Sequence, residues 1–417
     1  MKTYSCVLLC CLFAAAAFSD PPSGLLERGG ERLFPIGFYD LPEDEAGLRE
    51  MADAGVNLVR CRSVEDLDRL QAAGMQGVVP LPLDKGPADD LRARVERLAE
   101  HPALAVWEGP DEIVWNFTAY SGLFKKLGIH KQSGAWWKQT PEAVAYAEKR
   151  AAEIMPNMRA SVAMIREIDG GAHPVWINEA QQSDTAYVRQ YLDFVDITGC
   201  DIYPIKHGKS DLARIGEGVE RWKQVGRGKP VYMVLQAFSW NELGDYYGAK
   251  ETAYPTFAES RHMAYASIAH GARGILYWGG HYCKSPQLRQ SLYALTSELA
   301  ALQPFLTAPD VPGAGAGIIE MDYDTANPGV AAAVRKNGGD WLAILVNEDD
   351  TPHMAVVARG LDEIEGQTLH ELYGDKTVSV NGGEFITRMM PYDVQVFCTS
   401  RKYEAPRPGR EFGKADN

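Results

Sequence analysis

Short apolar segments and amphipathic helical segments alternate eight times between residues 31 and 304. The apolar segments run without polar alternation, which is typical of strands in a parallel sheet covered on both faces. Eight such βα units in roughly 270 residues predict a closed (β/α)8 barrel, a TIM barrel. The main rival, an open doubly wound sheet, needs a glycine-rich phosphate loop after an early strand, and the sequence has none. The predicted strands are 34–39, 57–62, 77–83, 104–107, 174–179, 197–203, 230–238 and 274–278.

The pattern changes beyond Pro312, and residues 310–400 consist of short β-rich segments. Turn signals such as Asn337-Gly338 and Asn381-Gly382 separate them. We therefore expect a C-terminal antiparallel β-sandwich, followed by a polar tail over 401–417. The predicted sandwich strands are 317–321, 330–335, 341–347, 353–358, 368–372 and 394–398.

Residues 1–19 have the features of a signal peptide. Lys2 gives a positive start, residues 7–17 form an apolar core, and Ala17 and Ser19 supply small residues at the −3 and −1 positions of a cleavage site. The apolar core is too short to span a membrane, which takes about 20 residues. We therefore expect an exported protein, secreted or periplasmic, without membrane attachment after cleavage.

The formal net charge of −14 argues against nucleic acid as a partner, because nucleic-acid binding needs a basic surface. It also argues mildly against a polyanionic substrate, unless a local basic pocket overrides it. Four cysteines lie beyond the signal peptide, singly, and no histidine pair at ligand spacing accompanies them. The sequence therefore indicates no metal site and no cofactor. It does not indicate an oligomeric state.

Two other classes of hydrolase lack their motifs in this chain. Metal-dependent amidohydrolase barrels need His-x-His on the first strand, and that strand has no histidine. Serine hydrolases with a nucleophile elbow need Gly-x-Ser-x-Gly, which is absent.

The fourth predicted strand carries the most suggestive stretch. Gly109-Pro110 ends the strand, because proline cannot donate to the strand ladder, and Asp111 and Glu112 follow at once. Active sites of (β/α)8 barrels lie at the C-terminal ends of the strands, so the other strand ends belong to the same rim. The rim is acidic and aromatic, and residues 113–139 add further aromatic side chains.

Glycoside hydrolysis uses two carboxyl groups, one of which protonates the leaving oxygen. Aromatic rings also suit sugars, whose C–H faces are apolar. We predict Glu112 as the general acid/base, with Asp201 and then Glu179 as the second carboxylate, and Asp111 as a further catalytic residue. A structural alternative is that Glu179 pairs with an arginine of strand two. The candidate substrate-binding residues are Tyr39, Arg60, Asn178, Tyr203, Gln236, Trp240, Trp278 and His281.

These features resemble clan A of the glycoside hydrolases. Trp107-Glu-Gly-Pro-Asp-Glu112 is similar to the clan's strand-four signature, in which tryptophan and three further residues precede Asn-Glu. The resemblance implies that Glu112 is the general acid/base. It also implies that Asp111, in the place of the asparagine, hydrogen-bonds the sugar.

Three further strand-end positions match the clan, and one departs from it. The resemblance extends to Tyr203 on strand six, Trp278 on strand eight and an arginine on strand two, Arg60 or Arg62. The clan's nucleophile is a glutamate that ends strand seven, where this sequence has Gln236. An amide cannot act as a carboxylate nucleophile.

Three interpretations follow from this departure. A rearranged carboxyl pair is the first, with Asp201 or Glu179 as the partner of Glu112, or Glu242 if its loop folds back. In the second, the substrate supplies its own nucleophile, because adjacent Asp111 and Glu112 resemble the β-hexosaminidase arrangement, where the aspartate orients an acetamido group. In the third, the barrel binds carbohydrate without catalysis. The sequence thus predicts an exported O-glycosidase acting on an oligo- or polysaccharide, with the second and third interpretations as alternatives.

Overall fold

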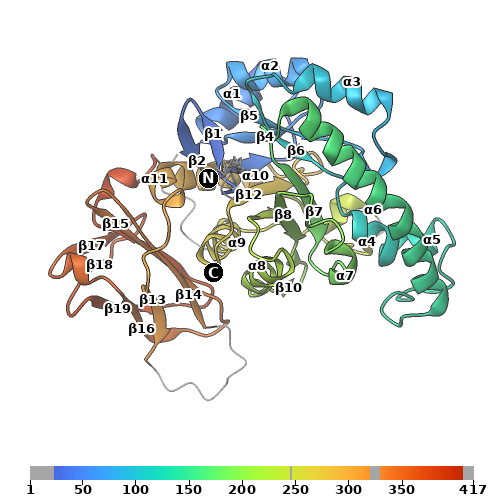
Figure 1. The fold of residues 1–417 in the computed structure, drawn as a ribbon. Coiled ribbons are helices and arrows are strands. Elements are labelled where there is room, and N and C mark those ends of the chain that lie inside the picture. The colour runs from blue at the N-terminus through green and yellow to red at the C-terminus, as the bar shows by residue number, and fades with distance from the viewer. Residues whose placement is uncertain (1–22, 245–246, 320–328, 407–417) are drawn as a thin grey trace, which may run out of the picture.

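The computed structural model describes residues 23–244, 247–319 and 329–406. Eight parallel strands close into a barrel in the order β11-β12-β3-β4-β5-β6-β7-β8, so that β12 pairs with β3 (Figure 1). The predicted TIM barrel is therefore confirmed. The barrel strands are β3 (Ile36–Phe38), β4 (Leu58–Arg60), β5 (Gln76–Pro80), β6 (Leu104–Glu108), β7 (Val175–Ala180), β8 (Ile197–Ile202), β11 (Val231–Gln236) and β12 (Gly274–Trp278).

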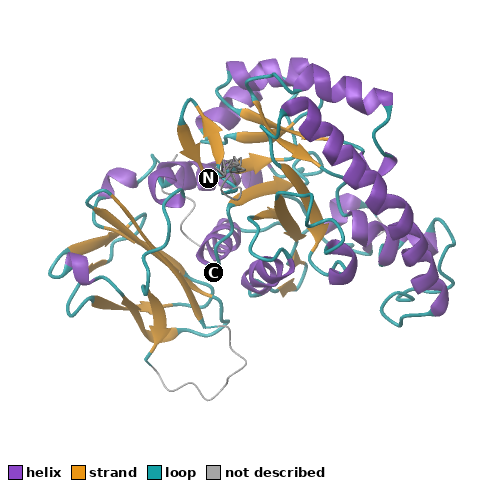
Figure 2. Ribbon diagram, in the orientation of Figure 1, coloured by secondary structure: helices purple, strands orange, loops and turns teal. Residues whose placement is uncertain are grey.

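Helices surround the barrel strands (Figure 2). Several of them begin at signals visible in the sequence: Ser63 and Thr256 form capping boxes at α2 and α9, and Thr140 caps α6 with a proline in the first turn. The helices that follow barrel strands are α1 (Glu45–Asp53), α2 (Val64–Ala72), α3 (Asp89–Leu98), α6 (Pro141–Asp169), α7 (Thr185–Val188), α8 (Arg214–Val225), α9 (Phe257–Ala269) and α10 (Pro286–Ala301). Two short helices, α4 (Ile113–Thr118) and α5 (Gly122–Lys125), lie in the aromatic insertion between β6 and α6.

The barrel interior is filled by apolar side chains that alternate along each strand with those facing the helices. Leu58, Val106, Trp176 and Val234 belong to this inner cluster, together with Tyr232. A hairpin of β1 (Leu26–Arg28) and β2 (Glu31–Leu33) covers the N-terminal ends of the strands, where the Tyr232 hydroxyl donates to the Gly24 carbonyl. The C-terminal ends of the strands are left as the open mouth.

The C-terminal part of the chain forms two antiparallel sheets, which confirms the predicted sandwich. One sheet has the order β13-β16-β19 and the other β14-β15-β20-β17-β18. Two of these strands, β18 and β19, were not predicted. The strands are β13 (Gly315–Ile318), β14 (Val330–Asn337), β15 (Asp340–Asn347), β16 (His353–Arg359), β17 (Thr368–Glu371), β18 (Thr377–Ser379), β19 (Glu384–Met389) and β20 (Val394–Cys398).

The sandwich packs against the barrel through α9 and its neighbours (Figure 1). Arg261 of α9 donates to the Val394 carbonyl and pairs with buried Glu298 of α10 at 2.7 Å. His270, at the end of α9, contacts Glu348 just beyond β15 at 3.0 Å. These contacts hold the sandwich against the side of the barrel, so that it does not cover the C-terminal ends of the barrel strands.

Two predictions concern segments outside the described residues. The proposed signal peptide, 1–19, and most of the polar tail, from residue 407 on, fall there, as do the last two residues of the strand predicted over 317–321. Among the described residues, no helix is both long enough and apolar enough to cross a membrane. The cysteines at 61, 200, 283 and 398 are buried and free.

Candidate active site

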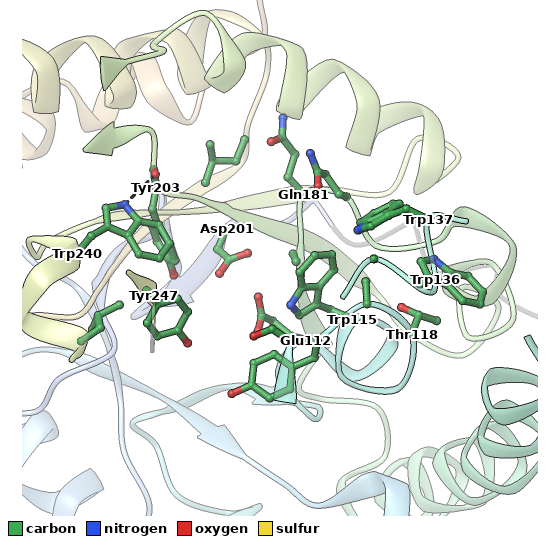
Figure 3. Close-up of a pocket in the computed structure, with 18 of the residues that line it drawn as sticks. Glu112, Trp115, Thr118, Trp136, Trp137, Gln181, Asp201, Tyr203, Trp240 and Tyr247 are labelled. Atoms are coloured by element: carbon green, nitrogen blue, oxygen red, sulfur yellow. Dashed lines mark hydrogen bonds between the residues drawn. The ribbon is translucent and has the colours of Figure 1, made fainter. Parts of the chain in front are cut away.

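A cavity of about 640 Å³ opens at the C-terminal ends of the barrel strands (Figure 3). Glu112 and Asp201 lie at its centre. Tyr203, Trp240 and Tyr247 stand on one side of this pair, and Trp115, Trp136 and Trp137 of the insertion stand on the other. Trp137 is 55% exposed, although tryptophan is usually well buried. The cavity thus combines carboxyl groups with exposed aromatic faces.

Glu112 has an unusual backbone that aims its side chain. It follows the Gly109-Pro110 break after β6 and takes a left-handed conformation with φ of 51° at the N-terminus of α4. This region is rare for residues other than glycine, and it persists only where the surroundings hold it. The Glu112 N–H donates to the Asn178 carbonyl at 2.9 Å, and its own carbonyl accepts from the Asn116 N–H at 2.8 Å.

Glu179 holds the segment that follows Glu112. Its carboxylate accepts hydrogen bonds from the backbone N–H groups of Val114 at 3.0 Å and Trp115 at 3.4 Å, and from the Ser183 hydroxyl at 2.7 Å. The side chain is fully buried and does not line the cavity. Glu179 therefore anchors the N-terminus of α4, and the geometry gives no support to the prediction that it is the second catalytic carboxylate.

Strand alternation explains the orientation of Glu179. On β7, Trp176 points into the barrel, whereas Val175 and Ile177 face the helices. Side chains two residues apart share a face, so Asn178 follows Trp176 toward the mouth and Glu179 follows Ile177 outward. The alternation of side chains along β7 is visible in the sequence and distinguishes Glu179 from Asn178.

The Glu112 and Asp201 carboxyls face each other at the centre of the cavity and interact electrostatically (Figure 3). Burial raises the pKa of the Glu112 carboxyl strongly, and the negative charges of Asp201, Asp111 and Glu179 raise it further. Burial, then the charge of Asp111, also raises the pKa of Asp201, while a hydrogen bond from Tyr203 opposes that rise. Two carboxyls in contact resist joint ionisation. The Glu112 carboxyl therefore retains its proton to a higher pH than an ordinary glutamate.

Asp111 and Asn178 form a polar corner of the same cavity. The Asn178 amide donates to Asp111 Oδ1 at 2.9 Å. Burial raises the pKa of Asp111, and the hydrogen bond from Asn178 opposes that rise. The other side-chain atom of Asn178, Oδ1, is buried and accepts no hydrogen bond within the described part of the chain. Such an acceptor suits a ligand hydroxyl or amide N–H.

Arg60 pairs with a carboxylate that sequence reasoning missed. Glu108, the last residue of β6, is fully buried and lies 2.5 Å from the Arg60 guanidinium, which also stands 5.1 Å from the centre of the Tyr39 ring. Burial raises the pKa of Glu108 to about 7, against the stabilising charge of Arg60. Arg60, predicted to bind substrate, does not line the cavity, whereas Tyr39 does. The signal for Glu108 was its place two residues after the inward-facing Val106.

Gln236 and Glu242 are both engaged in structural hydrogen bonds. The Gln236 amide is fully buried, donates to the carbonyls of Ile205 and Phe238, and accepts from the Ile205 N–H. Glu242 accepts from the backbone N–H groups of Ser239 and Lys284. Neither side chain lines the cavity. The loop of Glu242 thus does not bring a carboxylate to the place that the clan's nucleophile occupies.

The aromatic residues predicted on β8 and β12 meet at the mouth. Tyr203 and Trp278 stack with ring centres 5.4 Å apart, and Trp240 packs on Tyr203 at 6.1 Å. All three line the cavity. His281 lies at the outer rim, where its Nδ1 contacts Asp40 at 2.6 Å, and it does not line the cavity. No group of three or more His, Cys, Asp or Glu side chains within the described ranges could hold a metal ion.

Comparisons with known proteins show the fold. No protein-family model and no curated protein matches the sequence. The structure of a β-galactosidase from Bacillus circulans sp. alkalophilus is similar with a TM-score of 0.54 at 10% sequence identity, over 88% of this chain and 99% of that chain. A catalytic mutant of a GH42 β-galactosidase from G. stearothermophilus gives 0.54 at 9% identity, over 88% and 98%.

A third structure, the β-galactosidase from the psychrophilic Marinomonas ef1, has a TM-score of 0.49 at 13% identity, and the match covers 64% of this chain and 60% of that one. At such identities a structural likeness speaks for architecture alone. The two β-galactosidases with a TM-score of 0.54 therefore confirm the resemblance to clan A glycoside hydrolases at the level of architecture, namely the barrel and its trailing β domain.

Sequence reasoning also missed the basic side chains of the mouth. Lys206, Lys209 and Arg214 line the cavity and follow β8, the strand that carries Asp201. Their signal was three cations within nine residues directly after a strand end, in a chain with a net charge of −14.

The raised carboxyl pKa values predict how stability depends on pH. Burial raises the pKa of both Glu108 and Glu179 from 4.5 to about 7. The folded state therefore binds more protons than the unfolded state between these values, and the free energy of unfolding falls as pH rises from 5 to 8. Each carboxyl contributes at most about 3 kcal/mol to this fall, at 1.36 kcal/mol per pKa unit.

Urea denaturation at pH 5 and pH 8 measures this dependence. Glu108→Gln, which mimics the protonated carboxyl, is expected to flatten it, whereas Glu148→Gln on the exposed face of α6 is expected to leave it unchanged. Equal stability of the wild type at both pH values would contradict the prediction.

Proposed function

We propose that this protein is a glycoside hydrolase in which Glu112 is the general acid. The observation that carries the proposal is the pair of carboxyls, Glu112 and Asp201, at the centre of a cavity lined with aromatic rings, where burial and the charge of Asp201 raise the pKa of Glu112. A general acid must hold its proton near neutral pH, and glycosidases achieve this by raising the pKa of one carboxyl of a pair. The barrel architecture shared with β-galactosidases is consistent with this chemistry.

The proposed reaction begins with proton transfer from Glu112 to the glycosidic oxygen. The C–O bond then breaks, and positive charge develops on the sugar ring. Asp201, in its ionised form beside the ring, stabilises that charge. Water completes the hydrolysis by adding to the anomeric carbon, and its proton returns to the carboxyl pair.

A substrate-assisted reaction is the second candidate. The position of the clan's nucleophile holds Gln236, whose amide is used in structural hydrogen bonds, and no other carboxylate among the described residues replaces it there. Asp111 lies beside Glu112 and is positioned by Asn178, so that it can orient a 2-acetamido group of the substrate. In this case the acetamido oxygen attacks the anomeric carbon. Paired substrates that differ only in a 2-acetamido or 2-hydroxyl group separate the two candidates, because the substrate-assisted enzyme turns over only the former.

A panel of polysaccharides and oligosaccharides, with product analysis by chromatography, tests the proposal. The wild type is expected to release reducing ends from at least one member, and Glu112→Gln is expected to bind that member without releasing them. Binding by both forms without turnover would instead favour a carbohydrate-binding protein.

We also propose that the protein is exported, on the basis of the sequence of residues 1–19. N-terminal sequencing of the mature protein tests this proposal. The expected first residue is Asp20. A mature chain that retains Met1 would contradict it.

A further inference from the structure

One end of the cavity is basic, in contrast to its acidic centre. Lys206, Lys209 and Arg214 all line the cavity. The short strands β9 (Ile205–Lys206) and β10 (Lys209–Ser210) form a hairpin in which Lys206 and Lys209 are directly paired. Arg214 begins α8 just beyond this hairpin. The loop after β8 thus gathers three cations beside the strand that carries Asp201.

No ion pair in the described ranges joins Lys206, Lys209 or Arg214 to a carboxylate, although Asp211 lines the same cavity and Glu251 contacts His207 of the hairpin at 2.9 Å. The Arg214 guanidinium instead donates to the neutral side chain of Gln181, whose own amide donates back to the Arg214 carbonyl at 3.3 Å. The Lys206 ammonium stands 4.2 Å from the centre of the Trp240 ring. The fold therefore positions these two charges without neutralising them.

Clustered cations that no carboxylate pairs with directly cost free energy. Partial burial lowers the pKa of Lys206, and the charges of Arg214 and Lys209 lower it further. An anion between the three would reverse this effect, since an opposite charge within about 4–6 Å favours the charged form of a lysine. In a protein with a net charge of −14, a basic cluster in the wall of the cavity at the barrel mouth indicates an anionic ligand.

We propose that the cavity binds an anionic saccharide, with the acidic group of the sugar against Lys206, Lys209 and Arg214 and its ring against Trp240 and Tyr203. The binding of the anionic saccharide is proposed here, and its cleavage with Glu112 as the general acid rests on the proposed function. Arginine binds carboxylate and sulfate in the same two-pronged way, and lysine adds a point charge. The shared chemistry is therefore an anionic sugar, either a uronic acid or a sulfate ester.

Binding to the catalytically impaired Glu112→Gln protein tests the proposal without requiring turnover. The probes for isothermal titration are trigalacturonic acid and its carboxyl-reduced counterpart, and a carrageenan tetrasaccharide and its desulfated counterpart. We expect one anionic member to bind at least about 10-fold more tightly than its neutral counterpart at 50 mM salt, and the preference to shrink at 500 mM salt because screening weakens it. A preference within the trigalacturonic acid pair identifies carboxylate as the anion, and a preference within the carrageenan pair identifies sulfate.

Variants of the cluster assign the preference to these side chains. Lys206→Gln and Lys209→Gln, each in the Glu112→Gln background, remove one charge from the exposed hairpin and are expected to lower the affinity for the anionic probe about 3- to 10-fold and to leave the affinity for the neutral probe unchanged. Lys149→Gln, on an exposed face of α6, is the matched control. Thermal unfolding of each variant verifies that it folds.

The outcomes separate this inference from the proposed function. Equal affinity for the charged and neutral members of both pairs would overturn the inference, and so would a preference that survives both lysine substitutions. Hydrolysis of neutral glycans alone would overturn it while supporting the glycosidase. A preference for the anionic probe that depends on Lys206 and Lys209, without cleavage by the wild type, would support the inference and contradict the proposed hydrolysis.

Discussion

Glu112→Gln is expected to lower kcat about 1,000-fold on any glycoside that the wild type cleaves, because general acid catalysis contributes roughly 10²–10⁴ to the rate. Glutamine retains the size of the side chain and cannot deliver a proton. The Michaelis constant is expected to change little, since Glu112 contributes mainly to the transition state. Steady-state kinetics measures both quantities.

The matched control and a second variant sharpen this prediction. Glu148→Gln makes the same chemical change on the exposed face of α6 and is expected to leave kcat unchanged. Asp201→Asn removes the charge that, after burial, most raises the pKa of Glu112. Glu112 acts in its protonated form, so activity is lost as pH rises through its pKa. In Asp201→Asn that alkaline loss is expected at a lower pH than in the wild type.

Two results would remove the assignment. Wild-type turnover by Glu112→Gln is the first. The second concerns the pH at which activity is lost on the alkaline side of the pH–activity profile. If this pH stays the same or rises in Asp201→Asn, Asp201 does not raise the pKa of Glu112.

Arg60→Met is expected to cost about 3 kcal/mol in the free energy of unfolding at pH 8, since removing one partner of a buried ion pair leaves the other charge uncompensated. Glu108 is fully buried and its pKa is already about 7 with Arg60 in place. Without Arg60 its pKa rises further, so at pH 5 Glu108 is protonated and needs no counterion. The cost is therefore expected to be much smaller at pH 5.

Urea denaturation of Arg60→Met at the two pH values measures this difference. The double variant Arg60→Met/Glu108→Gln is expected to recover most of the lost stability at pH 8, because neither member of the pair then carries a charge. A loss that is equal at pH 5 and pH 8, and that the second substitution does not reduce, would indicate that Arg60 acts only through its packing on Tyr39.

Much of the candidate site could be predicted from strand counting. Once eight βα units are recognised, the end of the fourth strand and the end of the sixth must lie at the same mouth, two strands apart. This places Glu112 and Asp201 together without any knowledge of their side-chain conformations. The aromatic residues Tyr203 and Trp278 follow by the same argument, and the structure stacks them.

Strand counting alone was not enough where a residue's face decides its surroundings. Glu179 and Asn178 are adjacent at the end of β7, yet Glu179 turns toward the helices and Asn178 toward the cavity. Glu108 turns inward and forms an ion pair with Arg60. Arg60 therefore does not line the cavity, although the sequence predicted that it binds substrate. Successive side chains of a strand point to opposite faces, so the sequence position of each of these residues along its strand predicts the face on which it lies.

The sequence by itself determined the barrel, its trailing sandwich and the strand ends that meet at the mouth, because hydrophobic periodicity and chain order suffice to specify them. Only the tertiary structure decided that Glu112 takes a left-handed backbone, that burial and the charge of Asp201 raise its pKa, and that the loop after β8 builds a basic wall in the same cavity. The physical reason is that these features depend on irregular backbone and on burial shared between distant segments. Neither irregular backbone nor burial between distant segments produces a periodic pattern in the sequence.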